Sequence, residues 1–127
     1  MLAICIPTRN RLHSLIETLN SCFLFQDIVP CKVFVYDNSD TEHALNTYDF
    51  IKNWVSRNNA IACAETLPQA MKINWSRAVE LAFRDKTISH IALVSDRRLV
   101  TPFLLEAYLH CLNSNTDLTI YDNQRLW

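Results

Sequence analysis

Apolar residues along this chain occur in two spacings that alternate from one end to the other. Short apolar or β-branched runs, typical of buried parallel strands, occupy residues 2–6, 32–36, 60–64, 88–94 and 118–121. Segments with helical spacing lie between them, at residues 12–23, 41–57, 69–84 and 102–112. This order predicts an α/β fold, a three-layer sandwich with helices on both faces of a mainly parallel sheet.

The same spacing predicts how two helices begin and which side chains they bury. Asn10 is the expected cap of the first helix, and Pro102 fits the first turn of the last one. The expected inward residues of the first helix are Leu12, Leu15, Ile16, Leu19 and Phe23. Those of the second helix are Leu45, Tyr48, Ile51, Trp54 and Val55.

Composition narrows the function classes. The 127 residues, half of them hydrophobic, predict one domain spanning residues 1–127. The absence of glycine excludes the phosphate loop, the dinucleotide fingerprint and the nucleophile elbow, which all need it. A net charge of −1 argues against nucleic-acid binding through the overall field, although a local anion pocket is compatible with it.

The five cysteines form no CxxC pair, so their spacing fits neither a zinc site nor a secreted disulfide framework. We expect a reduced, cytoplasmic protein, with Cys5 and Cys63 as buried small hydrophobic residues. No segment is expected to cross a membrane. The opening apolar run, residues 1–6, is too short for the core of a signal peptide and ends at Pro7.

Polar clusters follow three of the predicted strands, at residues 7–11, 37–40 and 95–98. The carboxyl ends of parallel strands share one edge of the sheet, where ligands of open α/β folds bind. The sequence therefore predicts a site at this edge.

Each cluster also has a purely structural interpretation. Asp37 could cap a helix or form an Asx turn, and Asp96 could pair with Arg97 or Arg98 at the surface.

Four segments, residues 4–11, 35–41, 74–82 and 91–102, resemble in order the N-terminal, nucleotide-binding half of a family 2 glycosyltransferase with the GT-A fold. The resemblance implies binding of a nucleotide-diphospho-sugar, with a UDP-linked donor expected, and transfer of its sugar to an acceptor hydroxyl. It also implies a site of named residues. The substrate-binding residues would be Pro7, Thr8, Arg9, Asp37, Ser39, Lys72, Asp96 and Arg98, and the catalytic ones Asp96 and Arg97.

The resemblance gives roles to several of these residues. Pro7 and Thr8 would line the base and ribose, and Asp37 would accept a hydrogen bond from the base. Asp96 would lie near the ribose and sugar. Lys72 would be a cation facing the nucleotide, although a solvated helix residue is the alternative.

The chain departs from the family in two respects. Arg97 and Arg98 stand where relatives place aspartates that bind Mg²⁺ or Mn²⁺, so no cofactor is expected unless Asp96 holds such an ion. An arginine in the metal's place, stabilising the departing diphosphate, is one hypothesis, and a decayed site is the other. The acceptor half, with its catalytic base, is also expected to be absent.

Two other function classes remain open. A non-catalytic module would bind a nucleotide-sugar or a partner chain without turnover, and could self-associate through the exposed sheet. Sugar transfer or donor hydrolysis would separate this module from an enzyme. A receiver-like domain with Asp37 as phospho-acceptor would need an acidic pair after the first strand, where Arg9 and Arg11 stand.

Overall fold

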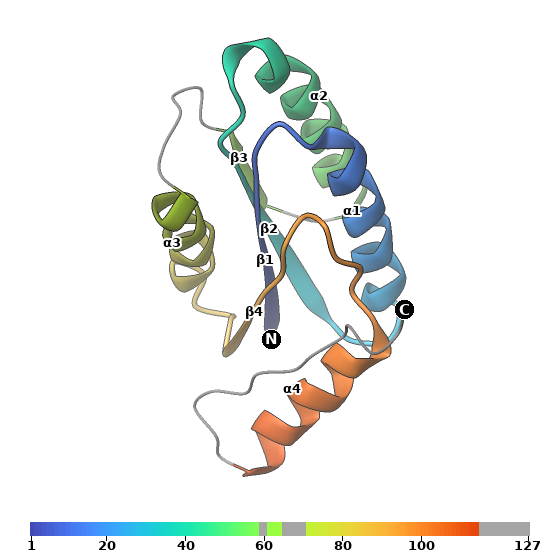
Figure 1. Ribbon diagram of the computed structural model, residues 1–127. Helices are drawn as coiled ribbons and strands as arrows, with labels where there is room; N and C mark the ends of the chain where they lie inside the picture. Colours follow the sequence, from blue (N-terminus) through green and yellow to red (C-terminus); the bar gives the residue numbers. More distant parts are fainter. Residues whose placement is uncertain (59–60, 65–70, 115–127) are drawn as a thin grey trace.

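Strands and helices alternate along the chain in the computed structural model, which describes residues 1–58, 61–64 and 71–114 (Figure 1). The strands are β1 (Leu2–Thr8), β2 (Cys31–Asp37), β3 (Ile61–Ala64) and β4 (His90–Leu93). The helices are α1 (Leu12–Gln26), α2 (Thr41–Asn58), α3 (Met71–Phe83) and α4 (Pro102–Ser114). The predicted alternation is confirmed for these elements, and the predicted strand at 118–121 lies outside the described residues.

The strands form one parallel sheet in the order β3-β2-β1-β4. In this sheet β1 pairs with β2 from Leu2↔Cys31 to Thr8↔Asp37, and on its other side with β4. The chain therefore moves outward from β1 through β2 to β3 and then returns to place β4 beside β1. The carboxyl ends of β1 and β4 mark the point where this direction reverses, which is where ligands bind in open parallel sheets.

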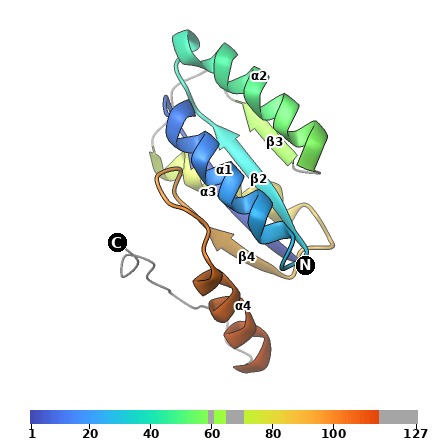
Figure 2. The same ribbon diagram turned by 90° about the vertical axis from the view of Figure 1, so that its right-hand side faces the viewer.

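Helices cover both faces of the sheet, as the α/β pattern predicts (Figures 1 and 2). Successive strand residues point to opposite faces. On one face, the strand residues pack with α1 and α2 in a cluster that includes Ile4, Ile6, Val33, Leu15, Leu19, Ile51 and Trp54. On the other face, a smaller cluster joins the sheet to α3, and its buried residues are Ala3, Cys5, Phe34, Tyr36, Ala78 and Ala82.

The predicted inward faces of α1 and α2 are wrong in part. Leu45 and Tyr48 of α2 are 68% and 49% exposed, and Phe23 of α1 is 49% exposed. Ile51 and Trp54 of α2 are buried as predicted, and Ala44 and Thr47 join them at helical spacing in place of Leu45 and Tyr48. The large apolar residues Leu45 and Tyr48 were predicted to be buried, but the smaller residues one position earlier, Ala44 and Thr47, are the buried ones.

Apolar side chains remain exposed around β4 and α4, and they include Leu93, Leu99, Phe103, Leu109 and Leu112. β4 lies at one edge of the described sheet, with α4 beyond it (Figure 2). Self-association through this part of the sheet stays a prediction. Among the described residues, no helix has both the length and the apolar character that crossing a membrane requires.

Candidate functional site at the carboxyl edge of the sheet

The three polar clusters come together at the carboxyl edge of the sheet, as the sequence predicts. Thr8 ends β1 beside Asp37, which ends β2, and the Thr8 carbonyl accepts a hydrogen bond of 2.9 Å from the Asn38 N–H. The third cluster reaches the same place through Asp96, whose side chain meets that of Thr8. Three loops therefore form one site: β1–α1, β2–α2 and β4–α4.

Arg9 and Asn10 fasten the β1–α1 loop to the β2–α2 loop. The Arg9 guanidinium donates to Asp40 at 2.6 Å and to the Asn38 carbonyl at 3.1 Å. The Asn10 side-chain amide donates to the Asp40 carboxylate at 2.8 Å, and its oxygen accepts from the Asp40 N–H at 2.8 Å. Arg9, expected to bind substrate, is thus already engaged in holding two loops together.

Asn10 does not cap α1, contrary to the prediction. Arg11 occupies the N-cap position, and its side chain makes no capping hydrogen bond. Asn10 instead adopts a left-handed backbone with φ of 52°, which turns its side chain to Asp40. In a chain without glycine, asparagine is among the residues that tolerate this conformation best.

Asp96 is a buried carboxylate with both oxygens occupied. The Thr8 hydroxyl donates to Oδ2 at 2.7 Å, and the Arg11 guanidinium donates to Oδ1 at 3.1 Å. Its side chain is 2% exposed, whereas that of Arg11 is 43% exposed. The suggested surface pair of Asp96 with Arg97 or Arg98 is therefore wrong, because Arg11 is its partner.

Asp37 is fully buried and only half satisfied. Its Oδ1 accepts hydrogen bonds from the N–H and the hydroxyl of Ser39, so the expected Asx turn forms. Its Oδ2 has no hydrogen-bond partner in the described part of the chain. Burial raises the pKa of Asp37, the Asp96 charge adds to this effect, and the Ser39 hydrogen bonds oppose it.

Two hydroxyls of α1 hold the β4–α4 loop, and the sequence analysis missed both. The Thr18 hydroxyl lies 2.8 Å from the Arg98 carbonyl oxygen and 3.1 Å from that of Asp96. The Ser21 hydroxyl accepts a hydrogen bond of 2.8 Å from the Val100 N–H. A usable signal existed, because Thr18 is a polar residue at helical spacing with inward-facing Leu15 and Cys22.

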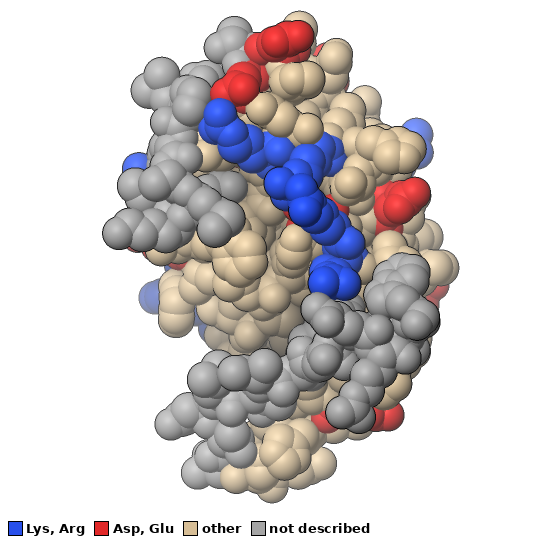
Figure 3. All heavy atoms as spheres, in the orientation of Figure 1, with Lys and Arg blue, Asp and Glu red and all other residues tan. Residues whose placement is uncertain are grey.

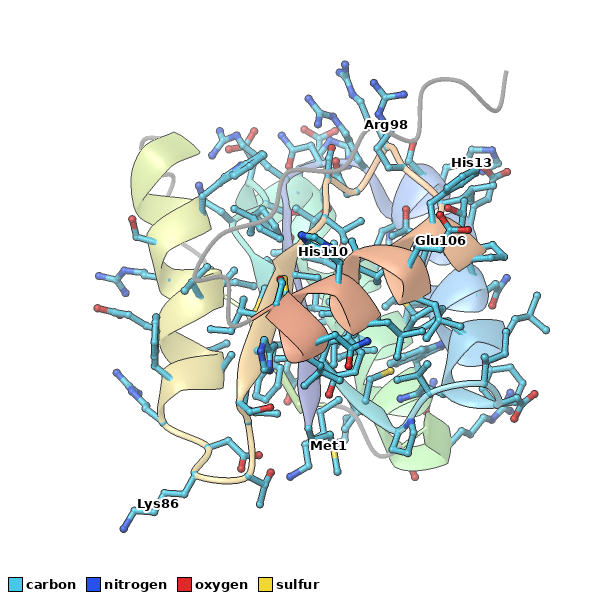
Figure 4. The ribbon with its side chains drawn as sticks, turned by 90° about the horizontal axis from the view of Figure 1, so that it is seen from below. Met1, His13, Lys86, Arg98, Glu106 and His110 are labelled. Atoms are coloured by element: carbon cyan, nitrogen blue, oxygen red, sulfur yellow. The ribbon has the colours of Figure 1, made fainter. Side chains whose placement is uncertain are left out.

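Four arginines, Arg9, Arg11, Arg97 and Arg98, crowd the β1–α1 and β4–α4 loops, and we call them the arginine stripe. Figure 3 shows basic side chains crossing this face as a continuous band. Arg97 is exposed, and Arg98, which points outward in Figure 4, is partly exposed. No carboxylate of the described residues forms a salt bridge with either of these two.

The arginine stripe makes this edge locally positive. This edge carries four guanidinium groups and the three carboxylates Asp37, Asp40 and Asp96, so its net charge is 4 − 3 = +1 with every group ionised. The whole chain carries −1. Since Arg9 pairs with Asp40 and Arg11 with Asp96, Arg97 and Arg98 supply the uncompensated charge. A site of this kind attracts anions.

The donor groups of this edge do not fit a Mg²⁺ or Mn²⁺ ion. Asp96, the one residue that the resemblance offers as a ligand, has both oxygens engaged and two arginines following it. Within residues 1–58, 61–64 and 71–114, no group of three His, Cys, Asp or Glu side chains could hold a metal ion.

Of the other expected site residues, Pro7 is buried in β1, and Ser39 is buried with its hydroxyl on Asp37. Lys72 lies in α3, but its side chain is outside the described part of the chain. Comparison of the chain with protein-family models, curated proteins and solved structures found no match.

Proposed function

We propose that this chain binds a nucleotide-diphospho-sugar at the carboxyl edge of its sheet, as a glycosyltransferase-like protein of the GT-A type. One observation carries the proposal: Arg97 and Arg98 lie in the loop after β4, next to the switch point where the strand order reverses between β1 and β4, and neither pairs with a carboxylate of the described residues. Guanidinium groups match the oxygens of a diphosphate in charge and geometry. The four family-like segments add the nucleotide-sugar to this anion.

Asp37 would meet the base of the nucleotide. Asp37 Oδ2 is an acceptor without a donor among the described residues, which suits the imide N–H of a uracil base. Because the Asp37 side chain is fully buried, a base reaches it only after the side chains above it move. Pro7 and Thr8 lie on the neighbouring strand β1, where Thr8 pairs with Asp37, and they would line the site beside the base and ribose.

Arg97 and Arg98 would perform the task that a metal ion performs in related enzymes. Negative charge develops on the diphosphate as the sugar leaves, and fixed cations beside it lower the barrier. Neither residue needs a divalent ion to bind phosphate oxygens. The proposal therefore predicts donor binding that EDTA does not abolish.

Thermal unfolding with UDP, dTDP, GDP and their sugars, each with Mn²⁺ and with EDTA, tests the proposal. A ligand at 100 times its Kd stabilises the folded state by about 2.7 kcal/mol, which raises Tm by several degrees. We expect the largest rise with a uridine nucleotide, retained in EDTA and lost in Arg97→Ala and Arg98→Ala. Arg84→Ala, an exposed arginine just after α3, is the matched control. Equal Tm values with and without every nucleotide would reject the proposal.

A non-catalytic binding module is the second candidate, and the engagement of the carboxylates favours it. Asp40 pairs with Arg9 and Asp96 with Arg11, while Asp37 is buried, so none of these three is poised as a base for an acceptor hydroxyl. Release of UDP from a UDP-sugar, measured over hours with and without candidate acceptors, separates the two. Binding without release identifies the module.

A further inference from the structure

We propose that Arg11 is a further phosphate-binding residue of this site and that Asp96 is its positioning residue. The inference rests on the proposed nucleotide-sugar site and specifies it. It reassigns Asp96 from the sugar to the protein's own arginine, and it adds a ligand contact from the start of α1.

Asp96 is held by hydrogen bonds from two sides. A carboxylate that is 2% exposed needs its charge and its lone pairs compensated, and the Thr8 hydroxyl and the Arg11 guanidinium do this from two sides. Thr8 belongs to β1, whereas Asp96 follows β4, so the Thr8–Asp96 hydrogen bond spans the switch point itself. Asp96 is thus held in place by the sheet and holds Arg11 in turn.

Arg11 binds Asp96 through one nitrogen of its guanidinium group. Its guanidinium uses Nη1 for Asp96, and a guanidinium group carries five N–H donors in one plane. The side chain is 43% exposed, so donors remain for a ligand in solution. The first turn of α1 contains no acidic residue, which leaves the helix dipole adding to the positive potential around Arg11.

Arg11 and the backbone of Arg98 are both connected to α1. Thr18 of α1 contacts the Arg98 carbonyl oxygen at 2.8 Å, so the backbone that carries Arg98 is fastened to the helix that begins after Arg11. The backbones that carry these two arginines are therefore fixed to one rigid element before any ligand arrives, and Asp96 also holds the Arg11 guanidinium. Loops fixed in advance lower the ordering cost of binding a phosphate.

The test is calorimetric titration of inorganic pyrophosphate and of UDP into the wild type and four variants. Arg11→Gln removes the guanidinium charge, and we expect it to weaken pyrophosphate binding about 10-fold or more. Arg11→Lys keeps the charge and should recover part of the affinity. Arg84→Gln is the control for the loss of one exposed positive charge, and its Kd should match that of the wild type.

Thr8→Val tests the positioning role of Asp96. This variant keeps every charge but removes one of the two bonds that orient the carboxylate. We expect a weaker Kd, with the dependence of Kd on NaCl concentration unchanged. Arg11→Gln should instead flatten that dependence, since one fewer cation faces the anion. A fold defect would lower Tm without producing this difference in salt response.

The outcomes separate this inference from the proposed function. If UDP binds and Arg11→Gln binds it as tightly as the wild type does, the inference is wrong and the nucleotide site stands. If pyrophosphate binding depends on Arg11 but UDP binds no better than pyrophosphate, the inference stands and the nucleotide proposal fails. If neither ligand binds the wild type, the inference is overturned.

Discussion

Asp37 and Asp96 are buried aspartates at the same edge of the sheet, yet the surroundings of Asp96 stabilise its negative charge and those of Asp37 destabilise it. Asp96 receives a hydroxyl and a guanidinium, so its negative charge is compensated on both oxygens. Within the described part of the chain, the Asp37 side chain accepts hydrogen bonds from Ser39 alone, and burial together with the Asp96 charge raises its pKa. A destabilising carboxylate with an unpaired oxygen at the carboxyl edge of a parallel sheet is the kind of group that a donor from a ligand could satisfy.

Replacing Asp37 with asparagine should stabilise the protein at pH 7. The Asn oxygen can accept the same two hydrogen bonds from Ser39, while the buried charge is removed. We expect a gain of about 1 kcal/mol, which corresponds to a rise in Tm of about 3–6 °C. Thermal unfolding at pH 7 without ligand measures it. A Tm below that of the wild type would show that the Asp37 charge is compensated in the folded state.

The pH dependence of this gain has a definite sign. The folded pKa of Asp37 is raised, so the folded state holds its proton longer than the unfolded state does. The contribution of Asp37 to wild-type stability therefore falls as pH rises from its unfolded pKa, about 3.9, to its higher folded pKa, and then stays level. The Tm advantage of Asp37→Asn should grow across this window and vanish below it.

Asp85→Asn is the matched control with the opposite sign. Hydrogen bonds from the Lys32 ammonium and from Thr87 hold the pKa of Asp85 well below its usual range. The stability that Asp85 provides is therefore present above the unfolded pKa and is lost as pH falls towards the folded pKa. Asp85→Asn should lower Tm slightly at pH 7 and converge with the wild type in acid.

At the scale of elements, the order of strands and helices could be predicted because each has its own apolar period. The inward faces of α1 and α2 were predicted less well. Period alone leaves a choice between neighbouring stripes, and on α2 the stripe with Ala44 and Thr47 is buried while Leu45 and Tyr48 are exposed. That choice depends on how closely a helix approaches the sheet, which the sequence of one helix does not contain.

The attachment of the β4–α4 loop to α1 should depend on the Thr18 hydroxyl. Thr18→Val removes a hydrogen bond to the Arg98 carbonyl and leaves buried acceptors behind, at a cost of about 1–3 kcal/mol. We expect a lower Tm and faster amide hydrogen exchange at Val100, because Ser21 is then the one of these two α1 hydroxyls that still holds the loop. Thr18→Ser, which keeps the hydroxyl, should preserve slow exchange at Val100. Equal exchange in Thr18→Val and the wild type would show that the loop is held by other contacts.

At the scale of the whole molecule, the sheet order decides what could be predicted about the site. The three polar clusters were identified because carboxyl ends of parallel strands share an edge, whichever order the strands take. The partner of Asp96 was not identified, because Arg11 lies 85 residues away and meets it only when β4 pairs with β1. The sequence showed which groups gather at this edge, and the strand order determined which of them bind one another.

The cysteines allow a test of whether both faces of the sheet unfold together. Cys5 is buried on the α3 face, whereas Cys22 and Cys31 are buried with α1. Burial raises the pKa of Cys5 to about 12 and that of Cys31 to about 11, so neither thiol reacts until water reaches it.

If residues 1–114 form one cooperative domain, a maleimide should label Cys5, Cys22 and Cys31 at one slow rate, and partly exposed Cys111 far sooner. Mass spectrometry of peptides from timed labelling measures each rate separately. Labelling of Cys5 well before Cys22 would mean that α3 separates from the sheet on its own. The loops that carry the arginine stripe would then be supported by the packing on the α1 face alone.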